Sequence, residues 1–161
     1  MVEKSILIVE DDDSTANQLK LWVNQLGYEV MGIANSGERA LELLDRRTPN
    51  VVVMDIGLPG DLDGIATAER IQARWSPAIV YATAYADDLT LERAARTKPV
   101  AYLVKPFDHY DLKPVLKLAL YPQPGVKQIG LHERVTPEEV RALLEPMRQP
   151  KKKRRIRLKH R

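Results

Sequence analysis

Residues 6–13 read ILIVEDDD, four strongly apolar residues followed at once by four acids. A short apolar run of this kind is typical of a strand that is buried on both faces of a sheet. Residues 51–55, VVVMD, repeat the arrangement, with a single acid closing the run. Four adjacent carboxylates repel one another, so they need either full solvation or a bound cation. The two stretches therefore predict buried strands that carry carboxylates at their carboxyl ends.

Outward from these two strands, apolar and helical segments alternate along the chain. Further strands are predicted at Ala78–Ala82 and Ala101–Val104, with a half-polar edge strand at Glu29–Ala34. Helical patterns fill the intervals, at residues 14–26, after Ser36, at 64–74, at 88–97 and from about Asp108. Short strands alternating with helices imply crossover units and a parallel sheet covered on both faces. In such folds the reactive groups gather at the carboxyl ends of the strands.

The composition limits the classes of protein to consider. The chain has 161 residues, no cysteine and a net charge of +3. The lack of cysteine excludes disulfides and cysteine metal sites and favours a cytoplasmic location. The first apolar run is too short for a signal peptide or a membrane span, so no membrane attachment is expected. Residues 1–120 carry 13 Lys and Arg against 18 Asp and Glu, and residues 121–161 carry 12 against 4, so an acidic body precedes a basic end.

Reactive side chains stand at the ends of four strands that are predicted to be neighbours in the sheet. Each has an ordinary structural explanation: an acid can cap a helix or open a turn, a Thr can be a strand residue, and a Lys a surface charge. Together they supply what phosphoryl chemistry needs, namely carboxylates for Mg²⁺, a carboxylate nucleophile, a hydroxyl donor and a cation. These candidates are Glu10, Asp11, Asp55, Thr83 and Lys105.

The segments ILIVEDD, VVVMDIGLP, YATAYAD and YLVKPF, in this order and spacing, resemble the receiver domain of two-component response regulators over residues 4 to about 120. The resemblance implies a flavodoxin-like, doubly wound, five-stranded parallel sheet in the order 2-1-3-4-5 with five helices. It also implies that Asp55 is the phosphoacceptor and that Mg²⁺ is the cofactor. Glu10 and Asp11 match the acid pair that holds the metal, with Asp55 and the carbonyl of Gly57 as further ligands.

The same resemblance assigns the phosphate-binding and switch residues. Thr83 matches the hydroxyl that follows the phosphoryl group, and Tyr102 matches the aromatic residue that swings inward with it. Thr83, Ala84 and Lys105 are expected to bind the phosphoryl group, and Lys105 to pair with Asp55 before phosphorylation. The bond from Lys105 to Pro106 matches one that is cis in the family. At a finer level, the longer segments DIGLPGDLDGI and TKPVAYLVKPFD resemble those of stand-alone receivers that work with sensor kinases bearing PAS-type domains.

Three features depart from the usual receiver pattern. The loop Leu58–Gly64 is one residue longer than the common form, which affects the fit to a kinase. Tyr85 is bulky for its position and is expected to screen the acyl phosphate from water. Pro114 falls about one and a half turns into the fifth predicted helix, where it removes a hydrogen bond at a cost of ~3 kcal/mol. That helix is therefore expected to start late or to kink.

After the receiver, at residues 1–121, we expect a linker at 122–135, a short amphipathic helix at 136–148 and a basic tail at 149–161. The helix has an apolar stripe that is expected to dock on the receiver or on a partner. Residues 151–161, KKKRRIRLKHR, contain eight Lys and Arg and no acid. Such a run attracts polyanions without reading sequence, or it simply remains solvated. The polyanion-binding candidates are Lys151, Lys152, Lys153, Arg154 and Arg155.

The leading hypothesis is a phosphorylation-dependent response regulator that takes a phosphoryl group from a sensor histidine kinase and signals to a downstream protein. It is not expected to be an enzyme beyond catalysing its own phosphorylation and dephosphorylation. An alternative hypothesis is a nucleic-acid-binding regulator whose receiver controls the basic tail. A third class, the aspartate-nucleophile phosphatases, needs a second Asp two residues after the nucleophile, where this chain has Gly57.

Overall fold

The apolar runs form one parallel sheet whose strands lie in the order β2-β1-β3-β4-β5, which confirms the predicted order. The computed structural model describes residues 3–84 and 87–121. The strands are β1 (Ser5–Val9), β2 (Glu29–Ala34), β3 (Val51–Asp55), β4 (Ala78–Thr83) and β5 (Ala101–Val104). The helices are α1 (Asp13–Gln25), α2 (Gly37–Arg46), α3 (Gly64–Arg74), α4 (Asp88–Arg96) and α5 (His109–Leu120).

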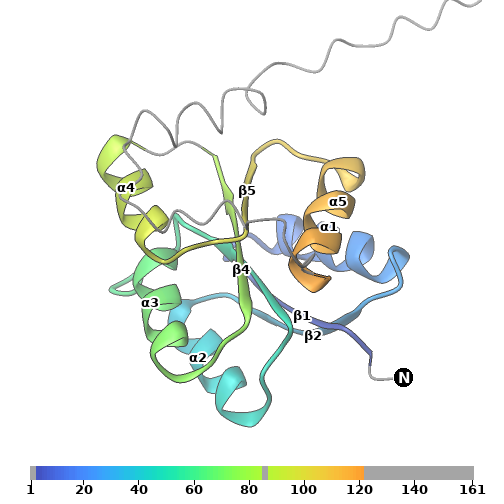
Figure 1. Cartoon of the computed structure of the whole chain (residues 1–161), viewed down its shortest axis with the longest axis horizontal. Coiled ribbons are helices and arrows are strands. Elements are labelled where there is room, and N and C mark those ends of the chain that lie inside the picture. Colours follow the sequence, from blue (N-terminus) through green and yellow to red (C-terminus); the bar gives the residue numbers. More distant parts are fainter. Residues whose placement is uncertain (1–2, 85–86, 122–161) are drawn as a thin grey trace, which may run out of the picture.

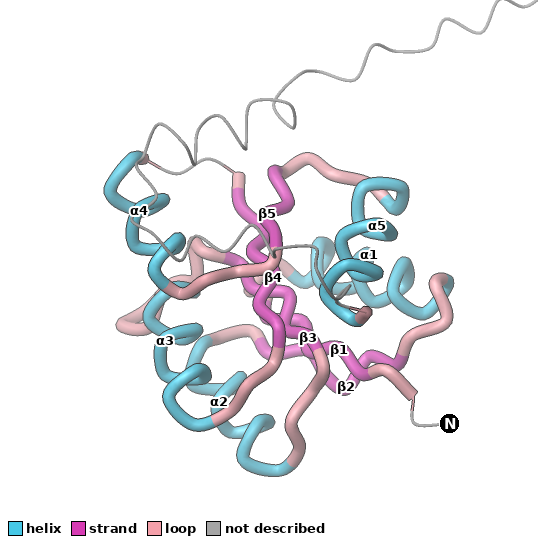
Figure 2. Tube along the Cα trace, in the orientation of Figure 1, coloured by secondary structure: helices cyan, strands magenta, loops and turns pink. Residues whose placement is uncertain are grey.

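Helices cover both faces of the sheet, as the alternation of elements predicted. Figures 1 and 2 show α1 and α5 on one side and α2, α3 and α4 on the other. Because side chains alternate along a strand, neighbouring residues of β1 belong to different cores. Ile6 and Ile8 pack with α1 and α5. Leu7 and Val9 pack in the core beneath α2, α3 and α4.

The register of the sheet brings the predicted site residues together. Val9 pairs with Met54, so the next residues along the two strands, Glu10 and Asp55, lie side by side. Across the sheet, Asp55 pairs with Ala82, and Thr83 pairs with Val104, which precedes Lys105. β1 lies between β2 and β3. From β1 the chain first adds β2 on one side and then adds β3, β4 and β5 on the other side, so the strand order reverses at β1. The side chains therefore meet at the topological switch point, where open α/β sheets bind ligands.

All five helices begin at a polar residue whose side chain accepts a backbone N–H of the first turn. Ser36, expected as a cap from the sequence, accepts the N–H of Arg39 at 3.1 Å. The other caps are Asp12, Asp63, Asp87 and Asp108. Because these caps precede helices that follow strands, they lie at the same edge of the sheet as the site.

The expected late start of the fifth helix is wrong, because α5 begins at His109 and continues through Pro114. Asp108 and Asp111 form a reciprocal capping box, and each accepts the backbone N–H of the other, at 3.1 and 3.0 Å. Pro114 has no N–H to offer the carbonyl of Tyr110, but Tyr110 is 82% exposed, so water can solvate that end of the helix. A strong cap and a buried leucine face therefore outweigh the single missing hydrogen bond.

Several predictions lie outside the described residues. These are the role of Tyr85, the linker at 122–135, the helix at 136–148, the tail at 149–161 and the cations from Lys151 to Arg155. Within residues 3–84 and 87–121, no helix is long and apolar enough to cross a bilayer.

Candidate functional site

Three acids from two adjacent strand ends form a candidate metal site. Glu10 and Asp11 follow β1, Asp55 ends β3, and one carboxylate oxygen from each lies within 4.8 Å of the others. Glu10 is 2% exposed and Asp55 8%, whereas Asp11 is exposed to solvent. Three carboxylates with one side open to water suit Mg²⁺, which prefers oxygen ligands and retains several waters. The residues at this edge therefore fit the metal that the sequence led us to expect.

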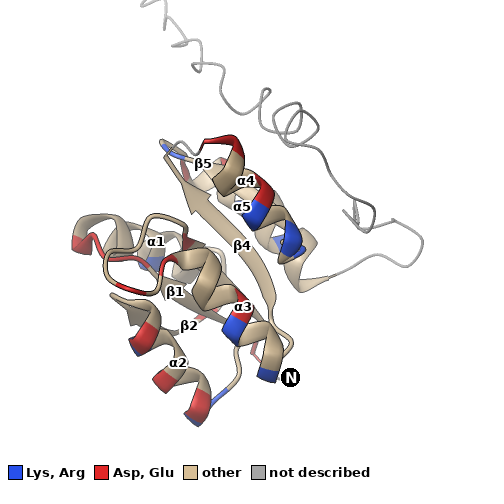
Figure 3. Cartoon of the chain, turned by 90° about the vertical axis from the view of Figure 1, so that its left-hand side faces the viewer, with Lys and Arg blue, Asp and Glu red and all other residues tan. Residues whose placement is uncertain are grey.

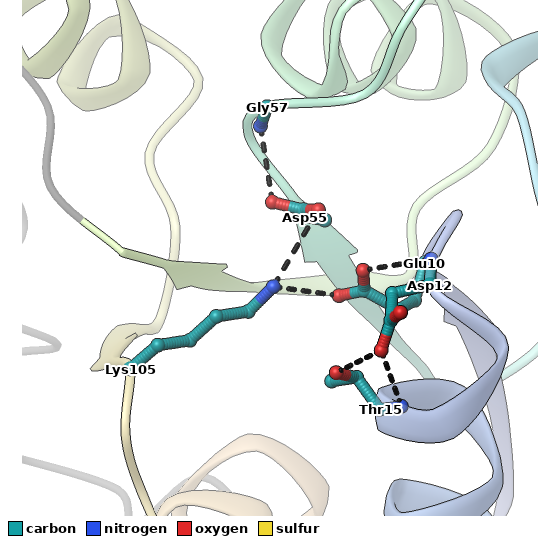
Figure 4. Close-up of polar contacts among 6 residues, drawn as sticks. All are labelled: Glu10, Asp12, Thr15, Asp55, Gly57 and Lys105. Carbon is teal, nitrogen blue, oxygen red and sulfur yellow. Dashed lines mark hydrogen bonds and ion pairs between the residues drawn. The ribbon is translucent and has the colours of Figure 1, made fainter.

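Lys105 supplies the positive charge at this cluster and links its two buried acids (Figure 4). Its Nζ lies 2.9 Å from Oε2 of Glu10 and 3.6 Å from Oδ2 of Asp55. Partial burial opposes ionisation of the ammonium, but the two carboxylates outweigh it and raise the pKa of Lys105. The expected pairing with Asp55 is thus present, but the closer partner is Glu10. The sequence did not indicate this partner, because the contact spans 95 residues of chain.

The pKa of Glu10 is raised, chiefly because burial disfavours its charged form, and repulsion from Asp55 adds to the effect. The hydrogen bond from Lys105 and the backbone N–H of Asp12, 3.2 Å from Oε1 of Glu10, oppose the shift. Because the pKa of Glu10 is raised despite these hydrogen bonds, Lys105 alone does not fully offset the cost of burying the negative charge of Glu10 next to Asp55. A divalent cation would relieve this repulsion.

Two glycines hold Asp55 in place. The N–H of Gly57 donates to Oδ1 of Asp55 at 3.0 Å and fixes the orientation of the carboxylate. Gly64 begins α3 directly behind the backbone of Asp55, and a Cβ on Gly64 would overlap the Asp55 carbonyl. Its own N–H donates to the carbonyl of Ile56 at 3.0 Å. Liganding of a metal by the Gly57 carbonyl stays a prediction.

Among the acids that follow β1, Asp12 is the one that serves as a helix cap, the structural role that the sequence allowed for these acids. Its Oδ2 accepts the backbone N–H and the hydroxyl of Thr15, at 2.8 and 2.6 Å (Figure 4). These two hydrogen bonds lower the pKa of Asp12. Asp12 therefore caps α1 and is separate from the three-acid cluster.

A cleft opens over Asp55 on the side facing β4 and α4. It contains the predicted phosphate-binding residues Thr83, Ala84 and Lys105, and Thr83 is buried there. The cleft also contains residues that the sequence analysis did not identify, among them cap residues of α3 and α4. Its lining consists of Asp55, Ile56, Gly57, Asp63, Thr83, Ala84, Asp87, Thr90 and Lys105. The position of a cap before a helix at this edge was the one sequence signal that could have identified Asp63 and Asp87.

Comparison with known proteins places this constellation in a family. The model of the response regulator receiver domain matches residues 6–117. The chain belongs to the response-regulator receiver family. It is 37% identical over 119 residues to the transcriptional regulatory protein PdtaR of Mycobacterium tuberculosis, covering 74% of this chain and 58% of the relative. It is 41% identical over 121 residues to the positive alginate biosynthesis regulatory protein of Pseudomonas aeruginosa, covering 73% and 48%. The receiver thus spans about half the length of these curated relatives.

Solved structures show the same fold. The signal receiver domain of a modulated diguanylate cyclase from Desulfovibrio desulfuricans is 34% identical, with a TM-score of 0.71, covering 74% of this chain and 95% of that one. A CheY-like receiver domain protein from Methanospirillum hungatei is 29% identical, with a TM-score of 0.69, covering 74% and 94%. Receivers are signalling modules that partner histidine kinases and downstream effectors, and they typically bind Mg²⁺ at an acidic pocket.

Tyr102, the expected switch aromatic of this receiver, is 7% exposed and belongs to the core beneath α2, α3 and α4. Its ring lies 5.8 Å from that of Tyr81, its register partner on β4. Within the described residues its hydroxyl has no hydrogen-bond partner, and burial raises the pKa of Tyr102. The hydroxyl of Tyr81, in contrast, bonds that of Thr97 at 2.6 Å. Among the described residues, the Tyr81 hydroxyl therefore has a hydrogen-bond partner and the Tyr102 hydroxyl does not.

A second, more apolar groove of the receiver meets the cleft at Lys105. Trp22 of α1 and Phe107, whose ring centroids are 6.1 Å apart, form part of its wall. The Lys105–Pro106 bond beside them is cis, as the family resemblance implied. The groove is lined by Ser14, Thr15, Gln18, Leu19, Trp22, Lys105, Pro106 and Phe107.

Proposed function

We propose that this receiver is a phosphorylation-dependent response regulator in which Asp55 accepts a phosphoryl group from a partner sensor histidine kinase. The observation that carries the proposal is the placement of Asp55: Gly57 fixes its carboxylate, two further acids lie beside it, and Lys105 lies 3.6 Å away. Catalysis would be limited to the chain's own phosphorylation and dephosphorylation. A cytoplasmic location, favoured by the cysteine-free sequence, is part of the proposal.

In the proposed reaction a carboxylate oxygen of Asp55 attacks the phosphorus of a phosphohistidine. A bond forms between this oxygen and phosphorus, which gives an acyl phosphate on Asp55. The bond from phosphorus to the donor nitrogen breaks, and that nitrogen keeps the electron pair. Glu10, Asp11, Asp55 and the carbonyl of Gly57 would hold Mg²⁺, which supplies charge neutralisation to the phosphoryl oxygens. Lys105, the Thr83 hydroxyl and the Ala84 backbone would bind those oxygens in the cleft.

The groove at Trp22 and Phe107 supports access by a kinase. It meets the cleft at Lys105, so a partner seated there would present a phosphohistidine close to Asp55. Its aromatic wall offers the apolar contact area that protein interfaces use. A receiver of this kind would bind its kinase through α1 and the segment before α5.

Signalling would follow from a change at Thr83 and Tyr102. A phosphoryl group on Asp55 would draw the hydroxyl of Thr83 toward it across the cleft. Tyr102 lies two strands away from Asp55, on the same face of the sheet as Tyr81. The movement of Thr83 would then change the populations of the inward and outward positions of the Tyr102 ring. Signalling through protein contacts would arise from that change at the surface around β5.

Asp55→Asn tests the proposal, because the amide keeps the size of the side chain but is a poor nucleophile. The full chain is incubated with acetyl phosphate and Mg²⁺ and its intact mass is measured. We expect the wild type to gain the mass of one phosphoryl group and Asp55→Asn to gain none. Asp12→Asn is the matched control, because Asn also caps helices and Asp12 lies outside the cluster. Equal mass gain in wild type and Asp55→Asn would contradict the assignment.

The second candidate is a nucleic-acid-binding regulator that acts through the basic tail under receiver control. Eight Lys and Arg within residues 151–161 favour it, since such a run binds phosphate backbones without sequence readout. Removing residues 150–161 should then abolish binding to a nucleic-acid duplex, and binding by the full chain should weaken steeply as salt rises. Binding that survives the truncation would exclude this role for the tail.

A further inference from the structure

α4 rests on the rest of the receiver through a small apolar face. Its buried residues are Leu91, Ala94 and Ala95. Two of the three are alanines, which remove little apolar area from water. The buried face of α5, in contrast, consists of three leucines. Polar contacts therefore contribute a larger share of the attachment of α4 than of α5.

The carboxyl-terminal end of α4 is attached by a buried polar network. Thr97, which follows the helix, donates its hydroxyl to the carbonyl of Ala94 at 2.7 Å and bonds the hydroxyl of Tyr81 at 2.6 Å. The side-chain amide of Gln72, on α3, donates to the carbonyl of Thr97. This end of α4 is thus held to both β4 and α3.

Within its last turn, α4 is joined to the beginning of α3 by an ion pair. Arg93 places its NH1 group 3.0 Å from Oδ2 of Asp63 and its NH2 group 3.4 Å from Oδ1. Partial burial opposes ionisation of Asp63, but the N–H of Ala66 and the guanidinium of Arg93 outweigh it, so the pKa of Asp63 is lowered. Figure 3 shows α3 and α4 on the same face, with basic residues on α4.

The acid of this pair also forms part of the wall of the cleft. Asp63 lines it together with Asp87 and Thr90, which stand at the start of α4. Asp63 is at the same time the cap of α3, which begins behind Asp55. The ion pair therefore connects the beginning of α3 with the last turn of α4, the two helices that border the cleft over Asp55.

We propose that Arg93 is a positioning residue for phosphorylation: through Asp63 it fixes the separation of α4 from α3, and with it the width of the cleft over Asp55. The inference rests on the proposed function, since it assigns the cleft to the phosphoryl group. Loss of the pair would widen the cleft. A small phosphodonor would then reach Asp55 faster, and water would reach the acyl phosphate faster.

Substitutions can remove the pair without removing the cap. Asp63→Asn keeps an oxygen for the N–H of Ala66, because Asn is as good a cap as Asp. Arg93→Gln removes the partner charge. The matched control is Arg96→Gln, on the same helix: Arg96 pairs with Glu92, also within α4, at 3.3 Å, so this pair does not reach α3.

The first measurement is amide hydrogen exchange of the unphosphorylated full chain. Residues 88–96 should exchange faster in Asp63→Asn, in Arg93→Gln and in the double variant, with no further increase in the double variant. Arg96→Gln should match the wild type. Unchanged exchange in both single variants would overturn the inference, whatever the outcome of the phosphorylation tests.

The second measurement follows phosphorylation of the same proteins by acetyl phosphate with Mg²⁺, and then the decay of the acyl phosphate after the donor is removed. Both rates should rise about two- to five-fold in either single variant, the range that a partly exposed ion pair allows. General destabilisation would lower the phosphorylated fraction instead. If the wild type is phosphorylated on Asp55 and the rates are equal in all variants, the positioning role is wrong while the proposed function stands. If the wild type is not phosphorylated at all, the proposed function fails and the positioning role fails with it, even where exchange shows that the pair holds α4.

Discussion

The two edges of the sheet use similar polar residues in opposite ways. At the amino edge, where the strands begin, Asn50 Oδ1 accepts the N–H of Ser5 at 2.9 Å and its hydroxyl at 3.3 Å. Arg47 meets Glu29 there with two hydrogen bonds of 2.7 Å. At the carboxyl edge, where the strands end, three acids form a cluster and a single lysine pairs with two of them, Glu10 and Asp55. The Arg47–Glu29 pair at the amino edge is balanced in charge, and the acid cluster at the carboxyl edge is not.

The pKa directions express this difference. Arg47 lowers the pKa of Glu29, so folding stabilises the charged form of that acid. Burial and the charge of Asp55 raise the pKa of Glu10, so folding disfavours its charged form. The Arg47–Glu29 pair at the amino edge therefore stabilises the fold, whereas ionised Glu10 in the acid cluster at the carboxyl edge reduces its stability and creates affinity for a cation.

Lys105→Ala should lower the free energy of unfolding by about 2 kcal/mol in the absence of Mg²⁺, because it leaves the buried acids without their cation. Breaking a fully buried pair costs more than this, but the Lys105 side chain is 25% exposed, which reduces the effect. Urea unfolding measures the loss. Millimolar Mg²⁺ should restore part of it, since the metal replaces the missing positive charge.

Lys113→Ala is the control for this experiment, because Lys113 is an exposed lysine in α5 and lies away from the acids. It should change the free energy of unfolding little and should not respond to Mg²⁺. If both variants lose the same stability, or if Mg²⁺ restores none of the loss in Lys105→Ala, the carboxyl edge is not the charge-deficient site described above.

Glu10→Gln should have two effects of opposite sign. Without Mg²⁺ it should stabilise the fold at neutral pH, because it removes the charge that burial disfavours. With Mg²⁺ it should weaken metal binding roughly tenfold, the scale of effect expected around a metal site. Calorimetric titration with Mg²⁺ and urea unfolding of the same samples measure the two effects. Lower stability in metal-free solution would show that Lys105 compensates Glu10 fully.

The sign of the pH dependence follows from the raised pKa of Glu10. The folded protein binds the Glu10 proton more tightly than the unfolded chain, so ionised Glu10 costs stability. That cost is absent below the ordinary value of 4.5 and is complete once the pH exceeds the raised folded-state value. The advantage of Glu10→Gln over wild type should therefore grow as the pH rises through this window. A constant difference across it would contradict the assignment.

Glu29→Gln should give the smallest effect, with the opposite sign. The pKa of Glu29 is lowered by Arg47, so its ionised form contributes stability above the ordinary value of 4.5. The variant should be slightly less stable than wild type at neutral pH, and the difference should vanish as the pH falls through the lowered folded-state value. Urea unfolding at several pH values measures it, and a gain in stability would remove the contrast between the two edges.

Much of the fold and the cluster could be predicted from the sequence because strand, acid and helix follow one another directly. Apolar runs ending in an acid placed Glu10 and Asp55 at one edge before any contact was known. The closer pairing of Lys105 with Glu10 could not be predicted, since it depends on how the loop before α5 crosses the edge. The same holds for Asp63 with Arg93 and for Tyr81 with Thr97, which depend on how helices pack across the fold.

The expectation of a late start for α5 failed for a different reason. From sequence, the effect of a proline inside a helix is judged by the hydrogen bond that the proline removes. The compensation comes from the capping box at Asp108 and Asp111 and from the buried face of the helix. Those terms are set by the fold, and they exceed the local cost.

The contact between Gly64 and Asp55 limits the effect of changes in the loop that joins them. Gly64 donates to Ile56 and touches the backbone of Asp55, so the two ends of the segment between them are already joined. A residue inserted between Gly57 and Asp63 enlarges a closed loop, and the entropic cost of that enlargement grows slowly with length. The contact of Gly64 with the Asp55 backbone is unaffected by such an insertion. The loop can therefore change in length and shape while the backbone that carries Asp55 stays in place.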